Sequence, residues 1–155
     1  MTLEQVEALL LGDEEFEARY GMTVAPGYLD FPEVLEPTRD ALVADVPPEW
    51  WSHLIIDAAS NTVIGFGGYK GPPTAGEVEI GYSVAPEFQR RGHATAAARL
   101  LVEHARAAGC RLVSAHTLPE PNASTRVLQR CGFVRSDDFE DPEMGTVWRW
   151  VLPLD

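Results

Sequence analysis

The chain has 155 residues, 45% of them hydrophobic, which suits a single domain spanning 1–155 whose core needs neither metal ions nor disulfides. Its formal net charge is −12, which argues against nucleic acids and anionic membranes as partners and suits either solubility or a cationic amine substrate. No stretch is long and apolar enough to cross a bilayer and the N-terminus lacks a basic signal-peptide start, so we expect a cytoplasmic protein.

The N-terminal part of the chain is predicted to be helical. Residues 2–20 carry apolar side chains at helical spacing, with Thr2 as a candidate N-cap and Gly21 as a stop. A short helix is expected over 37–43, in a proline-rich segment. Aromatic residues around this segment either line an acceptor pocket or belong to the core or a dimer contact: Tyr28, Phe31, Trp50 and Trp51.

The periodicity then changes to that of strands. Residues 51–57 and 62–69 predict an antiparallel pair around a turn, and the glycines inside the second strand indicate a kink or close packing. Residues 77–84 alternate. One face of that strand is apolar, and the other, which faces either solvent or a site, carries Glu77, Glu79, Gly81 and Ser83.

The C-terminal half continues the alternation of helices and strands. We expect a helix over 95–108, a strand over 111–117 and a helix over 122–131. A final strand pair is predicted at 133–135 and 146–152. No internal repeat or linker is visible.

The segment Gln89-Arg-Arg-Gly-His-Ala94 forms a glycine-bearing turn between a strand and a helix. Backbone N–H groups at a helix start lack intrahelical partners and bind anions, and Arg90 and Arg91 add positive charge. The turn therefore predicts a pyrophosphate site. Other phosphate motifs are excluded, because no Gly-Lys-Ser/Thr sequence is present and the glycines at 65–68 lie within a strand with no helix after it.

The pattern Gln/Arg-x-x-Gly-x-Gly/Ala after a strand resembles the acetyl-CoA loop of the GNAT superfamily of N-acetyltransferases. Residues 77–89, EVEIGYSVAPEFQ, are similar to the strand and loop that precede it in that family. Residues 118–133, LPEPNASTRVLQRCGF, resemble the later segment that closes the cofactor site. The resemblance covers residues 61–135 and is strongest to the branch that includes ribosomal-protein N-terminal acetyltransferases.

This resemblance implies an α/β (α+β) acyl-CoA N-acyltransferase fold, a mixed, mostly antiparallel sheet flanked by helices. It further implies acetyl transfer from acetyl-CoA, as co-substrate, to a primary amine by direct attack in a ternary complex. The backbone near Val84 would supply an oxyanion donor. The residues expected to bind the cofactor are Val84, Gln89, Arg90, Arg91, Gly92, His93, Ala94, Thr95 and Asn122.

The acceptor amine must lose a proton, and Glu79 is our first candidate for the base because it lies nearest the cofactor end of its strand. Glu77 and His116 are the alternative bases. Glu79 could equally be a non-catalytic residue on a solvent-facing side of the strand. Leu128 occupies the position at which many family members carry a tyrosine acid. Ser124 is therefore the candidate to hydrogen-bond the leaving sulfur, although Ser124 and Asn122 would also serve as helix caps.

No metal ion is expected, and Cys110 and Cys131 are interpreted as buried thiols, which favours direct attack over a ping-pong route. A rival hypothesis is a non-catalytic acyl-CoA-binding module, supported by the missing tyrosine. The acceptor stays open among peptide N-termini, polyamines, aminoglycosides and amino acids, and a homodimer is left open.

Overall fold

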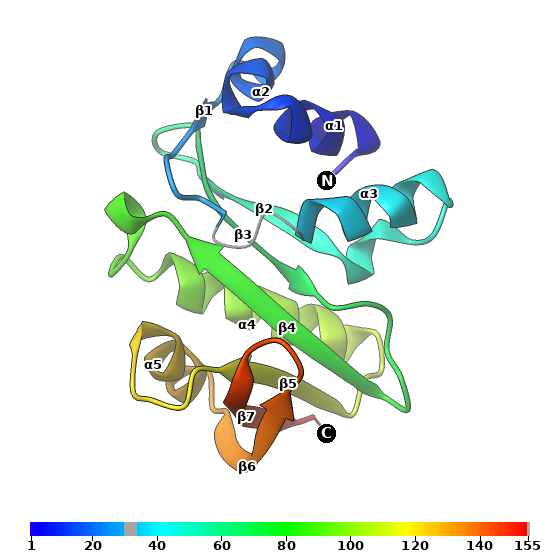
Figure 1. Ribbon diagram of the computed structural model, residues 1–155, viewed down its shortest axis with the longest axis vertical. Coiled ribbons are helices and arrows are strands. Elements are labelled where there is room, and N and C mark those ends of the chain that lie inside the picture. Colours follow the sequence, from blue (N-terminus) through cyan, green and yellow to red (C-terminus); the bar gives the residue numbers. More distant parts are fainter. Residues whose placement is uncertain (30–33, 155) are drawn as a thin grey trace. The chain divides into compact units, whose positions relative to one another are not determined.

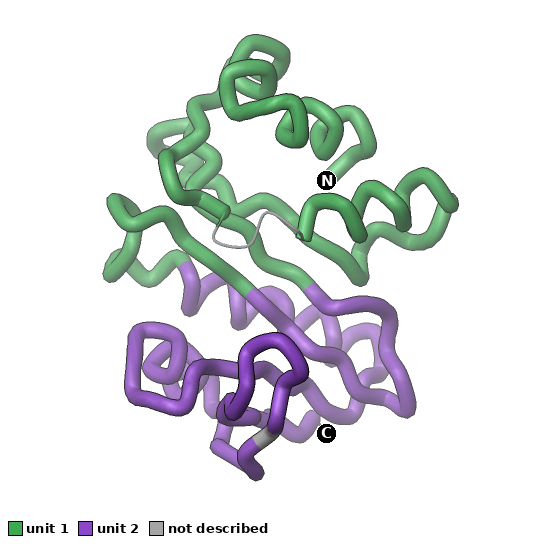
Figure 2. The backbone as a smooth tube through the Cα atoms, viewed as in Figure 1, with its two compact units in different colours: residues 1–68, 82–93 green, residues 69–81, 94–155 purple. Residues whose placement is uncertain are grey.

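The computed structural model describes residues 1–29 and 34–154, so Phe31 lies outside the described residues. The chain divides into two compact units (Figure 2). Unit 1 comprises Met1–Gly68 and Tyr82–His93, and unit 2 comprises Tyr69–Gly81 and Ala94–Asp155. That 1–155 form one domain stays a prediction.

Unit 1 begins with two short helices, α1 (Leu3–Leu11) and α2 (Asp13–Tyr20) (Figure 1). Thr2 caps α1 as expected, because its side chain accepts the N–H of Gln5 while the Gln5 side chain accepts the N–H of Thr2. The predicted helical run is broken at Gly12, where φ is 140°, and it ends at Gly21, where φ is 66°. The helix expected over 37–43 begins earlier, as α3 (Leu35–Val43).

The strands of unit 1 are centred on β3 (Thr62–Tyr69), all of whose residues are buried. β2 (Ser52–Asp57) pairs with it antiparallel, and the two-residue β1 (Thr23–Val24), which the sequence did not predict, pairs with it parallel. A short 3-10 helix, η2 (Pro48–Trp50), precedes β2.

The glycines of β3 lie where backbone approaches backbone. A Cβ atom at Gly65 would lie 2.0 Å from the carbonyl oxygen of Ser83, and one at Gly68 would lie 2.1 Å from that of Trp51. No side chain fits at such distances. The close packing predicted for these glycines is confirmed, and each of the two positions requires glycine.

β4 (Glu77–Val84) belongs to both units, since its first five residues lie in unit 2 and its last three in unit 1. In unit 2 it pairs parallel with β5 (Leu112–Thr117), which pairs antiparallel with β7 (Gly145–Pro153), which in turn pairs with β6 (Val134–Asp141). The seven strands thus form one mixed sheet. The remaining helices of the described chain are η3 (Pro86–Phe88), α4 (His93–Ala107) and α5 (Ala123–Arg130).

The expected fold class is confirmed, and so are the bounds predicted for β3 and β4. Burial along β4 alternates from Glu77 to Gly81, whereas at its end Tyr82 is half-buried and both Ser83 and Val84 are buried.

Candidate functional site

The turn that precedes α4 adopts an unusual backbone conformation. Arg90 has a φ of 64° and Gly92 a φ of 84°, so two of four consecutive residues lie in the left-handed region. For a residue with a side chain this conformation costs roughly 1–2 kcal/mol. The side-chain amide of Gln89 donates a hydrogen bond to the carbonyl oxygen of Val84, 2.9 Å away, and so ties the turn to the end of β4.

Position 92 favours glycine because its φ angle is positive, and not because neighbouring atoms leave no room for a side chain. An added Cβ atom would find no other atom within 4 Å, so the space in front of this residue is open. The first turn of α4 follows immediately, beginning at His93. Its N–H groups lack intrahelical carbonyl partners, and the positive end of the helix dipole lies there.

Two exposed cationic residues directly precede Gly92 in the sequence, Arg90 and Arg91. The guanidinium of Arg91 lies over the ring of Phe88, 5.0 Å from its centroid, which restrains the side chain. The residues at Gln89–Gly92 thus combine backbone donors, positive charge and room for a ligand. They fit a phosphate-bearing group such as the pyrophosphate of coenzyme A.

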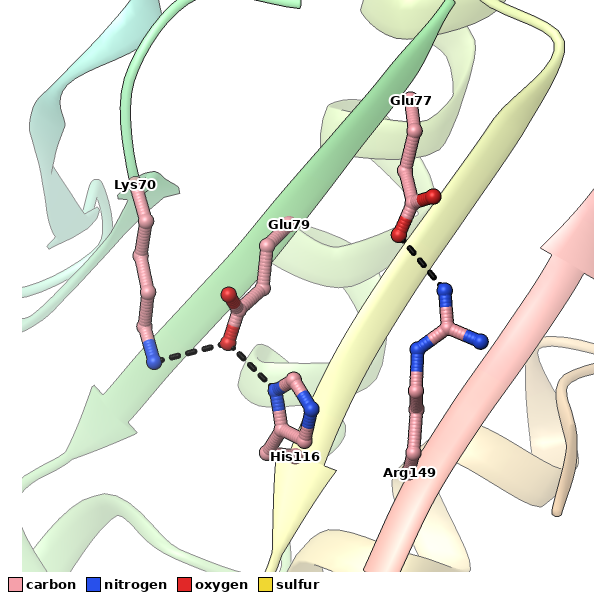
Figure 3. Close-up of polar contacts among 5 residues, drawn as sticks. All are labelled: Lys70, Glu77, Glu79, His116 and Arg149. Atoms are coloured by element: carbon pink, nitrogen blue, oxygen red, sulfur yellow. Dashed lines mark hydrogen bonds and ion pairs between the residues drawn. The ribbon is translucent and has the colours of Figure 1, made fainter. Parts of the chain in front are cut away.

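A second polar cluster lies in unit 2, where β4 and β5 present one face (Figure 3). The Glu79 atom Oε1 accepts hydrogen bonds from Lys70 Nζ at 2.8 Å and from His116 Nδ1 at 2.6 Å. Both side chains of the shorter contact are largely covered, with 26% of Glu79 and 21% of His116 exposed. Three groups that could move a proton are therefore in direct contact.

Two opposing effects act on the pKa of Glu79. Burial opposes ionisation of the carboxyl group, but the hydrogen bonds and charges of Lys70 and His116 outweigh it and hold the pKa of Glu79 below its ordinary value. The carboxylate is therefore ionised at neutral pH. An ionised carboxylate only accepts hydrogen bonds, so Nδ1 of His116 carries the proton in this contact.

Glu77 lies on the same face of β4 but has a different partner. The Arg149 guanidinium on β7 donates a hydrogen bond to Glu77 Oε1 at 2.7 Å (Figure 3). Arg149 also lies opposite His116 in the register of β5 and β7. Of the three candidate bases, the structure brings Glu79 and His116 together and pairs Glu77 with arginine.

Lys70 and Arg149 are residues that the sequence analysis did not select. Lys70 is the only lysine of the chain, and it directly follows a predicted strand. Those two facts could have drawn attention to it. Arg149 offered no signal, because it lies 72 residues from Glu77 and only the order of the strands brings them together.

The two motif residues of the second segment lie at the start of α5. Asn122 is its N-cap: Oδ1 accepts the N–H of Thr125 at 2.9 Å, while Thr125 Oγ1 accepts the N–H of Asn122 at 2.9 Å. Ser124 is half-buried in the first turn, and Leu128 is fully buried. The capping role of Asn122 is thus confirmed, whereas contact of Asn122 and Ser124 with a cofactor stays a prediction.

The register that joins β4 to β5 covers Glu77–Glu79 and Leu112–Ser114, although both strands continue beyond it. Strand residues beyond such a register can offer their backbone groups to a bound ligand. That an N–H near Val84 binds the acyl oxygen stays a prediction.

The thiols lie in environments that do not activate them. Burial raises the pKa of Cys110, and burial also raises that of Cys131 despite an opposing hydrogen bond and charge from Arg99. Cys131 is half-buried, with Sγ 3.8 Å from the carbonyl oxygen of Thr95, so the expectation that both thiols are buried holds fully for Cys110 only. A thiol with a raised pKa is a poor nucleophile at neutral pH.

Within 1–29 and 34–154, no group of three or more His, Cys, Asp or Glu side chains is arranged to hold a metal ion. In the same residues, no helix combines the length and apolar character needed to cross a bilayer.

Comparison with known proteins identifies the family. A family model described as an acetyltransferase (GNAT) domain matches residues 2–134. No curated protein matches the chain significantly. Among solved structures, the ribosomal-protein-S5-alanine acetyltransferase of Vibrio fischeri is 16% identical, covers 100% of this chain and 91% of its own, and has a TM-score of 0.73.

A ribosomal L7/L12 α-N-protein acetyltransferase in complex with coenzyme A is 20% identical, with 100% and 92% of the two chains covered and a TM-score of 0.70. A spermidine N-acetyltransferase of Vibrio cholerae is 18% identical over 78% of this chain and 73% of that one, with a TM-score of 0.64. At such identities the likeness shows the fold. With the family match over residues 2–134, it establishes that the chain belongs to the GNAT acetyltransferase family and is an acetyl-CoA-dependent acyltransferase.

Proposed function

We propose that the protein acetylates a primary amine by direct attack of the amine on the thioester in a ternary complex. The observation that carries this proposal is the turn at Gln89–Gly92, with its left-handed glycine, open space and paired arginines at the start of α4. The cofactor pyrophosphate binds there. We assign its contacts to Gln89, Arg90, Arg91, Gly92, His93, Ala94 and Thr95, and contacts of the pantetheine arm to Val84 and Asn122.

Acetyl-CoA, when bound, supplies an activated acetyl group. An N–H near Val84 stabilises the negative charge that develops on the acyl oxygen, and the hydroxyl of Ser124 donates a hydrogen bond to the sulfur as it departs. The nitrogen–carbon bond forms, the carbon–sulfur bond breaks, and a base takes one proton from the amine. The sequence favours Glu79 as that base, with Glu77 and His116 as the alternatives.

Direct attack is supported by the raised pKa values of Cys110 and Cys131, which disfavour a covalent acetyl-cysteine. For the acceptor, the names of the similar structures point to two of the four open classes, protein N-termini and spermidine. We propose a cytoplasmic protein, and a homodimer is an open part of this proposal.

A second candidate is a non-catalytic acyl-CoA-binding module. It is favoured by one observation, the burial of Leu128 where relatives carry a tyrosine acid. Both candidates predict binding of coenzyme A, so binding does not separate them.

The deciding experiment follows thiol release from acetyl-CoA with a panel of peptides, polyamines, aminoglycosides and amino acids, and identifies the acetylated product by mass spectrometry. We expect release that depends on one acceptor class, and its loss in the Gly92→Glu variant. Tight binding of coenzyme A without acceptor-dependent release would establish the non-catalytic module instead.

A further inference from the structure

The contact between Glu79 and His116 assigns a different base from the one that the sequence favoured. We propose that His116 accepts the proton of the acceptor amine and that Glu79 is a positioning residue, which acts through His116. The inference rests on the proposed acetyl transfer. It follows from the 2.6 Å contact between Glu79 Oε1 and His116 Nδ1.

The contact fixes the tautomer of the imidazole. The Glu79 carboxylate can only accept a hydrogen bond, so the neutral ring keeps its proton on Nδ1 and its lone pair on Nε2. Nε2 is therefore the ring atom that would take the proton of the amine, directly or through one water. A ring held in this way is pre-oriented, because a wrong tautomer would present an N–H instead of a lone pair.

Glu79 itself is poorly suited to take the proton. Its Oε1 atom already accepts two hydrogen bonds, from Lys70 at 2.8 Å and from His116 at 2.6 Å. Protonating this carboxylate would weaken both contacts, and for the same reason its pKa lies below the ordinary value. Histidine is the side chain that changes charge near neutral pH, where a general base works best.

Among the described residues, charged groups of several segments lie near His116. Glu79 on β4 contacts the ring, and Lys70, after β3, contacts Glu79. Arg149 on β7 lies opposite His116 and is paired with Glu77, so its charge is largely offset. Asp141, at the end of β6, lies within electrostatic range of both His116 and Lys70.

The proton balance is complete within this cluster. The amine proton moves to Nε2 as the new nitrogen–carbon bond forms, and the imidazolium that results is stabilised by Glu79. The carbon–sulfur electron pair leaves with the thiolate. Water or the thiolate then takes the proton from Nε2, which returns the ring to its neutral form.

The test compares kcat and KM of His116→Gln, Glu79→Gln and Lys70→Met, from about pH 5 to 9, with the best acceptor of the panel. Glu103→Gln is the matched control, because Glu103 is an exposed carboxylate on α4 that pairs with Arg106 outside this cluster. We expect kcat to fall about 10³-fold in His116→Gln and about 10- to 100-fold in Glu79→Gln, with little change in the KM for acetyl-CoA.

The pH profiles test whether Glu79 acts through His116. In Glu79→Gln the acid limb of the activity profile should move to lower pH, since the negative charge beside the imidazolium is gone. In Lys70→Met the limb should move to higher pH, because the opposing charge is gone. Added imidazole should partly restore His116→Ala and leave Glu79→Ala unchanged.

A larger loss in Glu79→Gln than in His116→Gln would overturn the proposal and make Glu79 the base. Equal small losses in His116→Gln and the Glu103→Gln control would also overturn it. Nitrogen NMR of His116 tests the tautomer without any activity: a ring protonated on Nε2 at neutral pH overturns the inference alone. A wild-type protein that acetylates no amine, with the Nδ1-protonated ring intact, overturns the proposed function instead.

Discussion

The turn at Gln89–Gly92 and the polar face of β4 are built in opposite ways. The turn is made of consecutive residues, and its features are backbone angles, a helix start and open space. The face is made of side chains from separate segments, and Glu79 and His116 lie 37 residues apart in the chain. The turn should therefore tolerate side-chain substitutions that keep its backbone conformation. The polar face of β4 should instead be sensitive to the loss of single side chains.

The largest effect is expected at Gly92. Glu there would impose a strained left-handed angle and place a negative charge before the helix start, so affinity for coenzyme A should fall at least about 100-fold. Calorimetric titration measures it. Gly92→Ala is the control, since the space is open and only the strain is added, and it should bind within about tenfold of wild type. A folded Gly92→Glu protein with unchanged affinity would contradict the site.

Ser124 tests whether side chains outside the β4 face also take part in the reaction. Ser124→Ala removes one hydrogen bond to the departing sulfur, worth about 1.4 kcal/mol, and should lower kcat about tenfold. Steady-state thiol release measures this change. Full activity in Ser124→Ala would leave that serine as part of the helix start and nothing more.

The sequence predicted the turn better than the face for a physical reason. A turn that binds through its backbone needs glycine at one position and a strand and helix on either side, and all of these are local patterns. The partners of Glu79 depend on the register of β4 and β5 and on the path of the chain after β3, so neither Lys70 nor the His116 contact follows from local periodicity.

The same reasoning explains an error within the fold. Gly12 divides the N-terminal helical run although the apolar spacing continues across it, because the break depends on a backbone angle. The end of β3 and both ends of β4, by contrast, lie beside glycine or proline residues that are visible in the sequence: Gly71, Gly76 and Pro86.

Asn122 has one confirmed role and one proposed role, and a single variant separates them. Asn122→Ala removes the cap of α5 and should lower the free energy of unfolding by about 1 kcal/mol. If Asn122 also contacts the pantetheine arm, the KM for acetyl-CoA should rise severalfold, more than kcat falls. Asn122→Asp retains a capping oxygen but loses the amide, so it should keep the stability and still show the higher KM.

The smallest effect concerns acid stability. Because the pKa of Glu79 is lower in the folded protein than its ordinary value, its ionised form stabilises the fold above that ordinary value, and this contribution is lost as the pH falls through the lowered one. Wild type and Glu79→Gln should therefore differ in urea unfolding at neutral pH and converge once the pH lies below the lowered pKa of Glu79. A difference that persists unchanged in acid would place the effect of the variant in packing rather than in charge.

The glycines of β3 limit how this enzyme can change over generations. Gly65 lacks room for even one carbon atom, and the group it would strike is the carbonyl of Ser83, next to the end of β4. A replacement there would push on the segment to which we assign the pantetheine arm. In a library randomised at Gly65 and Gly68 and selected for activity, only glycine should be recovered at both positions. Substitutions that change which acceptor is used are therefore expected in other segments of the chain.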